Sequence, residues 1–136
     1  MPEMTVNAAP EQLAPVMDFV NKRLTALGCS NKVRFDVYVV VNEIFCNIIR
    51  YAYGPETGTV TVRVETEEDP PALTMTFMDR GVPFDPLAKE MPDTTTLPAW
   101  ERPLGGLGLF MVRRLVDEIA YVRRDGQNVL TLRKRV

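Results

Sequence analysis

The chain contains no histidine, and this absence excludes several chemistries at once. Without an imidazole there can be no Ser-His-Asp triad, no imidazole general base, no histidine-ligated zinc and no phosphohistidine. If the protein is an enzyme, its general base must therefore be a carboxylate or a lysine.

Cysteine and long apolar runs are also scarce. The two cysteines, Cys29 and Cys46, form no metal-binding pattern, and Cys46 falls in an apolar segment where a free buried thiol is expected. This usage favours a reducing compartment, so we expect a cytoplasmic protein. No stretch approaches the roughly 18 apolar residues of a membrane span. The first residues also lack the basic start and apolar run of a signal peptide, so we expect no membrane contact.

Charge of one sign is not in excess. The 16 lysines and arginines nearly balance the 18 aspartates and glutamates, giving a net charge of −2. This balance offers no general electrostatic attraction to nucleic acid, so we expect no direct nucleic-acid contact. The 136 residues, of which 46% are hydrophobic, suit a single domain with one core that spans residues 1–136.

The spacing of apolar residues predicts both helices and strands. Apolar residues recur at helical spacing in segments 11–28 and 31–53, and Ser30 is suited to cap the second segment. Alternation of apolar and polar residues predicts strands, and Asp125-Gly126 predicts a tight hairpin turn. The expected elements, in order, are strand 3–8, helices 11–28 and 31–53, strands 58–66 and 72–79, helix 106–117, and a hairpin of strands 118–124 and 129–135.

This order predicts an α+β fold. Strands grouped in antiparallel pairs, with helices covering one face, suggest a two-layer α/β sandwich with a mixed, mainly antiparallel sheet. Residues 81–104 are different, because they hold five prolines and the run Thr94-Thr95-Thr96 and show little periodicity. A structureless stretch of this length inside a compact domain indicates a functional loop or lid.

Two polar residues interrupt the apolar helix 31–53. Glu43 and Asn47 are four residues apart, so they stand about 40° apart around the helix. One interpretation is a polar stripe at the edge of the core. The other is a reactive site, in which the Asn47 oxygen is a neutral ligand for Mg²⁺ and the Glu43 carboxylate takes a proton from a nucleophile.

A third polar position ends the strand 72–79. Asp79 precedes Gly81, which permits a turn. Asp79 either only supports an Asx turn or also accepts a hydrogen bond from the exocyclic amine of adenine.

Glycines gather where helix 106–117 begins. Gly105, Gly106 and Gly108 form either a flexible hinge or an anion site, in which backbone N–H groups and the positive end of the helix dipole bind phosphate. The stretch is not a Walker A loop, because no Gly-Lys-Ser/Thr follows it.

In this order, the three clusters resemble the N, G1 and G2 boxes of the ATP-binding fold shared by gyrase, MutL and histidine kinases. More closely, VNEIFCNIIRYAYG, DRGVPFDP and ERPLGGLGLFMVRRLVDEIAY are similar to the stand-alone anti-sigma factor serine kinases of the RsbW and SpoIIAB type. The resemblance covers about residues 5–135. It implies a histidine-kinase-like ATP-binding fold with an ATP lid at residues 82–104.

The resemblance also implies a role for each site residue. Glu43 would be the general base for a serine hydroxyl of a partner protein, and Asn47 would hold the Mg²⁺ that bridges the ATP phosphates. Asp79 would bind the adenine amino group, and Gly81 would let the backbone approach the base. The other implied positions are Gly105, Gly106 and Gly108 around the phosphates, Arg102 near the terminal phosphate, and Thr131 as a support for adenine.

The implied function is an ATP-dependent serine/threonine protein kinase that phosphorylates an anti-anti-sigma factor of STAS type and sequesters a sigma factor. The resemblance also implies a homodimer. The alternative is a non-catalytic ATP-binding anti-sigma or regulatory module. A fragment of a two-component kinase that autophosphorylates on histidine is excluded within these residues, because they contain no histidine.

The expected lid departs from the resemblance in two ways. Pro83 stands where these kinases often carry a second glycine, and the stretch PDTTTLPAWERP is unusually rich in proline and threonine. Trp100 either packs in the closed lid or belongs to a partner surface.

Overall fold

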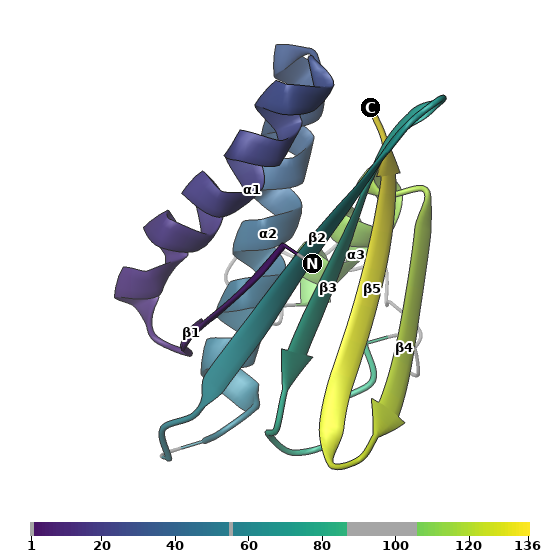
Figure 1. Cartoon of the computed structure of the whole chain (residues 1–136). Coiled ribbons are helices and arrows are strands. Elements are labelled where there is room, and N and C mark those ends of the chain that lie inside the picture. The colour runs from purple at the N-terminus through teal and green to yellow at the C-terminus, as the bar shows by residue number, and fades with distance from the viewer. Residues whose placement is uncertain (1, 55, 87–105) are drawn as a thin grey trace, which may run out of the picture.

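The structure is a computed structural model of the chain, and it describes residues 2–54, 56–86 and 106–136. Within these residues, three α-helices cover one face of a five-stranded sheet, so the fold has two layers (Figure 1). This is the α+β architecture and element order that the sequence predicts. The elements are β1 (Glu3–Asn7), a 3-10 helix (Pro10–Gln12), α1 (Leu13–Leu27), α2 (Asn31–Tyr51), β2 (Thr59–Glu68), β3 (Pro71–Asp79), α3 (Gly106–Leu115), β4 (Glu118–Arg124) and β5 (Gln127–Arg135).

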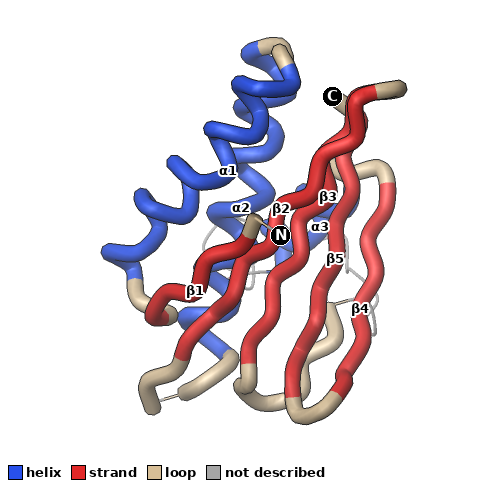
Figure 2. The backbone as a smooth tube through the Cα atoms, viewed as in Figure 1, coloured by secondary structure: helices blue, strands red, loops and turns tan. Residues whose placement is uncertain are grey.

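The strand order in the sheet is β1-β2-β3-β5-β4 (Figure 2). The expected sheet was mixed, but every pairing among the described strands is antiparallel. The reason lies in the last hairpin. A tight turn makes β4 and β5 antiparallel, and β5 enters the sheet beside β3 in the opposite direction, which leaves β4 at the edge.

The helices and the inner face of the sheet share one core. In β2, Val60, Val62 and Val64 are fully buried, while the residues between them face the other side, as the alternation predicts. Burying each such side chain contributes on the order of 1.5–3 kcal/mol. The buried apolar residues of α2 follow the expected helical spacing and are Val37, Val40, Val41, Ile44, Phe45 and Ile48.

Single residues set the ends of the two long helices. α1 ends at Leu27 because Gly28 adopts the left-handed conformation, with φ of 68°, and donates its N–H to the Thr25 carbonyl. α2 begins after Ser30, whose hydroxyl accepts a hydrogen bond from the Val33 N–H at 3.2 Å. None of the helices in the described part of the chain is long and apolar enough to cross a membrane.

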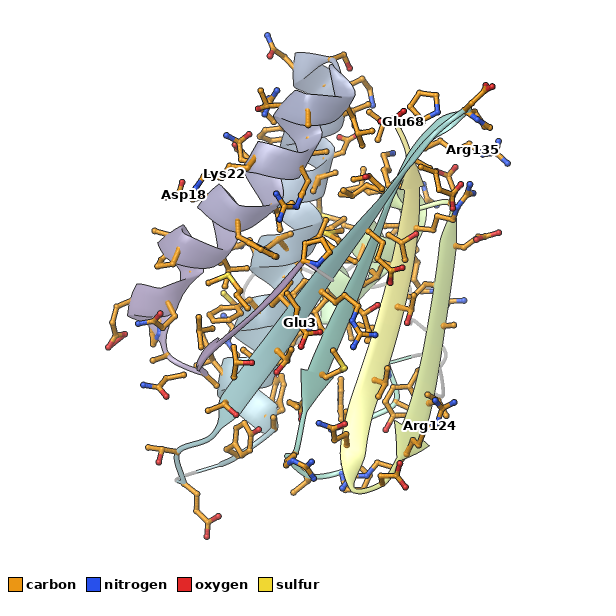
Figure 3. The ribbon with its side chains drawn as sticks, viewed as in Figure 1. Glu3, Asp18, Lys22, Glu68, Arg124 and Arg135 are labelled. Atoms are coloured by element: carbon orange, nitrogen blue, oxygen red, sulfur yellow. The ribbon has the colours of Figure 1, made fainter. Side chains whose placement is uncertain are left out.

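Charged side chains lie around the periphery of the two layers. Figure 3 shows Asp18 and Lys22 extending away from α1, with Arg135 at one end of the sheet and Arg124 at the other. The end marked by Arg124 is the one where β3 stops at Asp79 and β5 starts. The candidate site lies at this end.

Candidate functional site

A pocket lies between α2 and the end of the sheet where β3 stops and β5 starts. Its wall is mostly apolar and its polar groups are few, which is the usual character of a small-molecule site. The polar groups come from α2, β3, β4 and β5, so the pocket requires the assembled fold. The lining residues are Ile44, Asn47, Ile48, Tyr51, Ala52, Phe77, Asp79, Phe84, Pro86, Leu109, Tyr121, Asn128 and Leu130.

Asn47 lines this pocket with an unpaired carboxamide. The residue is 5% exposed, and neither Oδ1 nor Nδ2 has a hydrogen-bond partner among the described residues. Leaving a buried polar group unpaired costs about 1–3 kcal/mol. A leucine at this position would bring no such cost. The unpaired oxygen therefore indicates a ligand that completes the site.

Glu43 lies one helical turn before Asn47 and contacts the first turn of α3. A Cβ atom built on Gly108 would overlap the Glu43 carboxylate, whose Cδ would lie 2.7 Å away. A side chain at residue 108 would therefore have to displace the Glu43 carboxylate, so the constraint here is one of space rather than backbone conformation. Since α3 begins at Gly106, the carboxylate also lies near the N-terminal end of that helix.

Asp79 closes the turn that follows β3. The residue is 6% exposed, and its Oδ1 accepts a hydrogen bond from the Gly81 N–H at 2.9 Å. Gly81 packs so tightly on the end of α2 that a Cβ there would overlap the Ala52 carbonyl, which also accepts a hydrogen bond from the Val82 N–H at 2.7 Å. The Asx turn is therefore present, and Asp79 lines the pocket as well, so the two interpretations are compatible.

Asn128 is a pocket residue that the sequence analysis did not single out. It pairs with Asp79 across β5 and β3, and its Nδ2 donates to Asp79 Oδ1 at 3.0 Å and to the Val82 carbonyl at 2.8 Å. Its Oδ1 accepts from the Phe84 N–H at 3.2 Å and from the Tyr121 hydroxyl at 2.5 Å. Asn128 therefore connects β3, β4 and the loop after β3.

Thr131 lies on the other face of the sheet. The buried side chains of β5 are Asn128, Leu130 and Leu132, so alternation turns Thr131 outward, where it pairs with Thr76. The structure does not bring Thr131 to the pocket, and Asn128 lies there instead. Leu130 and Leu132 flank Thr131 in the sequence. Because alternate residues of a strand share a face, these two leucines already indicate that Thr131 points outward.

An aromatic pair forms another part of the wall. The rings of Tyr51, at the end of α2, and Phe84, in the loop after β3, are stacked with centroids 5.9 Å apart and planes 20° apart. Both residues line the pocket, so the pair adds apolar surface to its wall.

Besides Thr131, which lies on the outer face of the sheet, the predicted site residues differ in how close they lie to the pocket. Asn47 and Asp79 line the pocket, and Glu43, Gly81 and Gly108 lie beside it. Gly106 is the first residue of α3. Arg102, Gly105 and residues 87–104 of the expected lid lie outside the described residues.

The polar groups of the pocket suit Mg²⁺ only together with oxygens of a bound phosphate. The described residues contain no group of three or more His, Cys, Asp or Glu side chains that could hold a metal ion by themselves. Mg²⁺ often uses one or two protein ligands together with phosphate oxygens of its substrate. The unpaired Asn47 oxygen fits that arrangement.

A helical layer on one face of an antiparallel sheet, with an Asn on the central helix and an Asp at a strand end, defines a domain of the histidine kinase-like ATPase class. Residues 6–134 match the histidine kinase-like ATPase domain family, and the chain belongs to that family.

Its similar proteins include RsbW serine kinases. The serine-protein kinase RsbW of Bacillus cereus (strain B4264) is 30% identical over 137 residues, which covers 94% of this chain and 81% of the relative. The RsbW of Bacillus mycoides (strain KBAB4) is 29% identical with the same coverage.

A solved structure has the same fold. The crystal structure of the RsbU and RsbW domains of Rv1364c from Mycobacterium tuberculosis matches with a TM-score of 0.63 and 17% sequence identity. The match covers 99% of this chain and 32% of the solved chain, so this chain corresponds to about a third of that protein's length.

Proposed function

We propose that this chain is an ATP-dependent serine/threonine protein kinase of the anti-sigma factor type. It transfers the γ-phosphate of ATP to a serine of an anti-anti-sigma factor of STAS type, and it sequesters a sigma factor. The kinship with RsbW supports the class of protein. The observation that carries the proposal is the buried, unpaired carboxamide of Asn47, one helical turn from Glu43 in a pocket that also presents Asp79.

In the proposed reaction, Glu43 acts as the general base. Its carboxylate accepts the proton of the serine hydroxyl while that oxygen bonds to the γ-phosphorus and the bond from phosphorus to the ADP oxygen breaks. Phosphoryl transfer needs positioning and charge neutralisation more than covalent chemistry. Asn47 would hold Mg²⁺, which when bound would supply charge neutralisation at the phosphates. The start of α3, where Glu43 meets Gly108, supplies N–H groups suited to phosphate.

The other end of the pocket binds the base in this proposal. The Asp79 carboxylate accepts a hydrogen bond from the adenine amine, and Gly81 lets the loop backbone lie close to the base. The stacked rings of Tyr51 and Phe84 offer an apolar surface beside it. Arg102 and Gly105 near the phosphates, and a lid at residues 82–104, remain predictions from the resemblance.

The first test is a thermal-shift titration with ATP, with and without magnesium, followed by transfer of labelled γ-phosphate to a purified STAS-domain partner. A ligand at about 100 times its Kd should stabilise the fold by about 2.7 kcal/mol. The matched variant is Glu43→Gln, which should keep most of the nucleotide shift and lose phosphate transfer. No shift at millimolar ATP would overturn the proposal. A shift without transfer by the wild-type chain would favour the ATP-binding anti-sigma or regulatory module.

A homodimer is part of the same proposal. In the described part of the chain, no element covers the outer face of the sheet (Figure 1). Thr61, Thr131 and the exposed Val122 lie on that face, and in this proposal a second copy packs there. A molar mass by light scattering equal to that of one chain would contradict this part.

A further inference from the structure

The side-chain amide of Asn128 has only one orientation that satisfies its neighbours. Nδ2 faces two acceptors, the Asp79 carboxylate and the Val82 carbonyl, while Oδ1 faces the Phe84 N–H and the Tyr121 hydroxyl. Rotating the amide by half a turn would set its oxygen against two acceptors and its NH₂ group against an N–H donor. The hydrogen-bond partners therefore fix which atom is nitrogen and which is oxygen.

These contacts use the whole bonding capacity of Asn128. An asparagine side chain has two N–H donors and one oxygen with two lone pairs, and all four are engaged. Asn128 is 6% exposed and lines the pocket, yet no donor or acceptor remains for a ligand. Any effect of Asn128 on a bound base must therefore act through its neighbours.

The neighbour that matters is Asp79. Among the described residues, the hydrogen bonds to its carboxylate come from the Gly81 N–H at 2.9 Å and Asn128 Nδ2 at 3.0 Å, and both are accepted by Oδ1. Oδ2 is the oxygen left for a ligand. An ionised carboxylate only accepts hydrogen bonds. A fixed Oδ2 therefore favours a base that presents an amine and rejects one that presents a carbonyl.

We infer that Asn128, held by the Tyr121 hydroxyl, is a positioning residue that sets the nucleobase selectivity of the pocket in favour of 6-aminopurines over 6-oxopurines. The inference rests on the proposed nucleotide function. The inference adds to that function the residue that orients Asp79. Asn128 also ties the loop at Val82 and Phe84 to the sheet, so the aromatic wall and the carboxylate are held by the same side chain.

The test compares the Kd values of ATP and ITP, measured by calorimetric titration with magnesium, because ITP carries a 6-oxo group in place of the 6-amine. The wild-type chain should bind ATP more tightly. Asn128→Leu removes all four hydrogen bonds and should lower the ratio of ATP to ITP affinity by about tenfold or more. Tyr121→Phe removes only the hydroxyl that fixes the amide and should lower the ratio by less. Asn7→Leu makes the same change on exposed β1 and should leave the ratio unchanged.

The outcomes separate the inference from the proposed function. If the wild-type chain prefers ATP and folded Asn128→Leu and Tyr121→Phe keep the same ratio, the inference is overturned and the nucleotide function stands. The inference is also overturned if the wild-type chain binds the two nucleotides equally. If it binds neither, the proposed function fails and the inference fails with it. If Asn128→Leu does not fold, an unchanged ratio in Tyr121→Phe overturns the inference.

Discussion

The Glu43 carboxylate fills the space that a side chain at position 108 would need. A side chain at position 108 would therefore push this carboxylate aside, whereas Gly108 lets α2 and α3 meet with the carboxylate in place. In the proposed kinase, this contact brings the general base next to the segment that would bind the phosphates.

Gly108→Ala should therefore impair phosphate transfer. The added methyl group must displace Glu43 or the first turn of α3, and a misplacement of about 1 Å can cost about 100-fold in rate. We expect transfer of labelled phosphate to fall by about that factor, with a smaller effect on nucleotide affinity.

A double-mutant cycle in thermal unfolding tests the contact itself. Gly108→Ala should be less destabilising in a Glu43→Ala background, because the overlapping carboxylate is then absent. Strictly additive effects on the free energy of unfolding would contradict the contact.

Asn47→Leu should stabilise the protein while removing part of its function. The change replaces an unpaired buried carboxamide by an apolar side chain, so the free energy of unfolding without nucleotide should rise by about 1–3 kcal/mol. The magnesium-dependent part of the ATP thermal shift should disappear. Denaturant unfolding and the ATP titration measure the two effects. Asn42→Leu, on the same helix, is the control, and a loss of stability in Asn47→Leu would argue against an unpaired amide.

Asp79→Asn should change the preference for the base. Its oxygen would keep the hydrogen bonds from Gly81 and Asn128, so its NH₂ group would face the ligand in place of Oδ2. An NH₂ group at that place cannot hydrogen-bond the amine of adenine, but it can donate a hydrogen bond to the carbonyl of a 6-oxopurine. ATP affinity should fall by about tenfold or more while ITP affinity rises. Asp69→Asn, in the turn before β3, is the control. An equal loss for both nucleotides would show that Asp79 supports the fold without reading the base.

Thr131→Val should leave ATP affinity within about twofold of the wild-type value, because the side chain lies on the outer face of the sheet. Calorimetric titration checks this directly. A tenfold loss would mean that the resemblance located the adenine support correctly, and that the inward and outward positions of β5 differ from those in the structure.

Much of the fold could be predicted because its signals are local. The alternation of Val60, Val62 and Val64 gave the inner face of β2. Asp125 and Gly126 marked the last hairpin turn, where both residues have positive φ, at 53° and 77°. These signals depend on neighbours in the sequence. They can therefore be recognised in the sequence without knowing which strands pair.

The missing part of the site depends on pairing between distant segments. Asn128 enters the pocket because β5 lies beside β3 in a register that sets it opposite Asp79, which is 49 positions away. No spacing rule connects two such residues. The inward position of Asn128 could still have been read from Leu130 and Leu132, because alternate residues of a strand share a face. That argument would also have moved Thr131 out of the site.

The hydrogen bond from the Val82 N–H to the Ala52 carbonyl has a dynamic consequence. The carbonyls in the last turn of a helix have no partner within it, and here one of them holds the loop that follows Asp79. Fraying of the end of α2 would release the loop on that side, so helix end and loop open together. The rate of deuterium exchange at the Val82 amide therefore reports how often the helix end and the loop open. A bound base should slow this exchange.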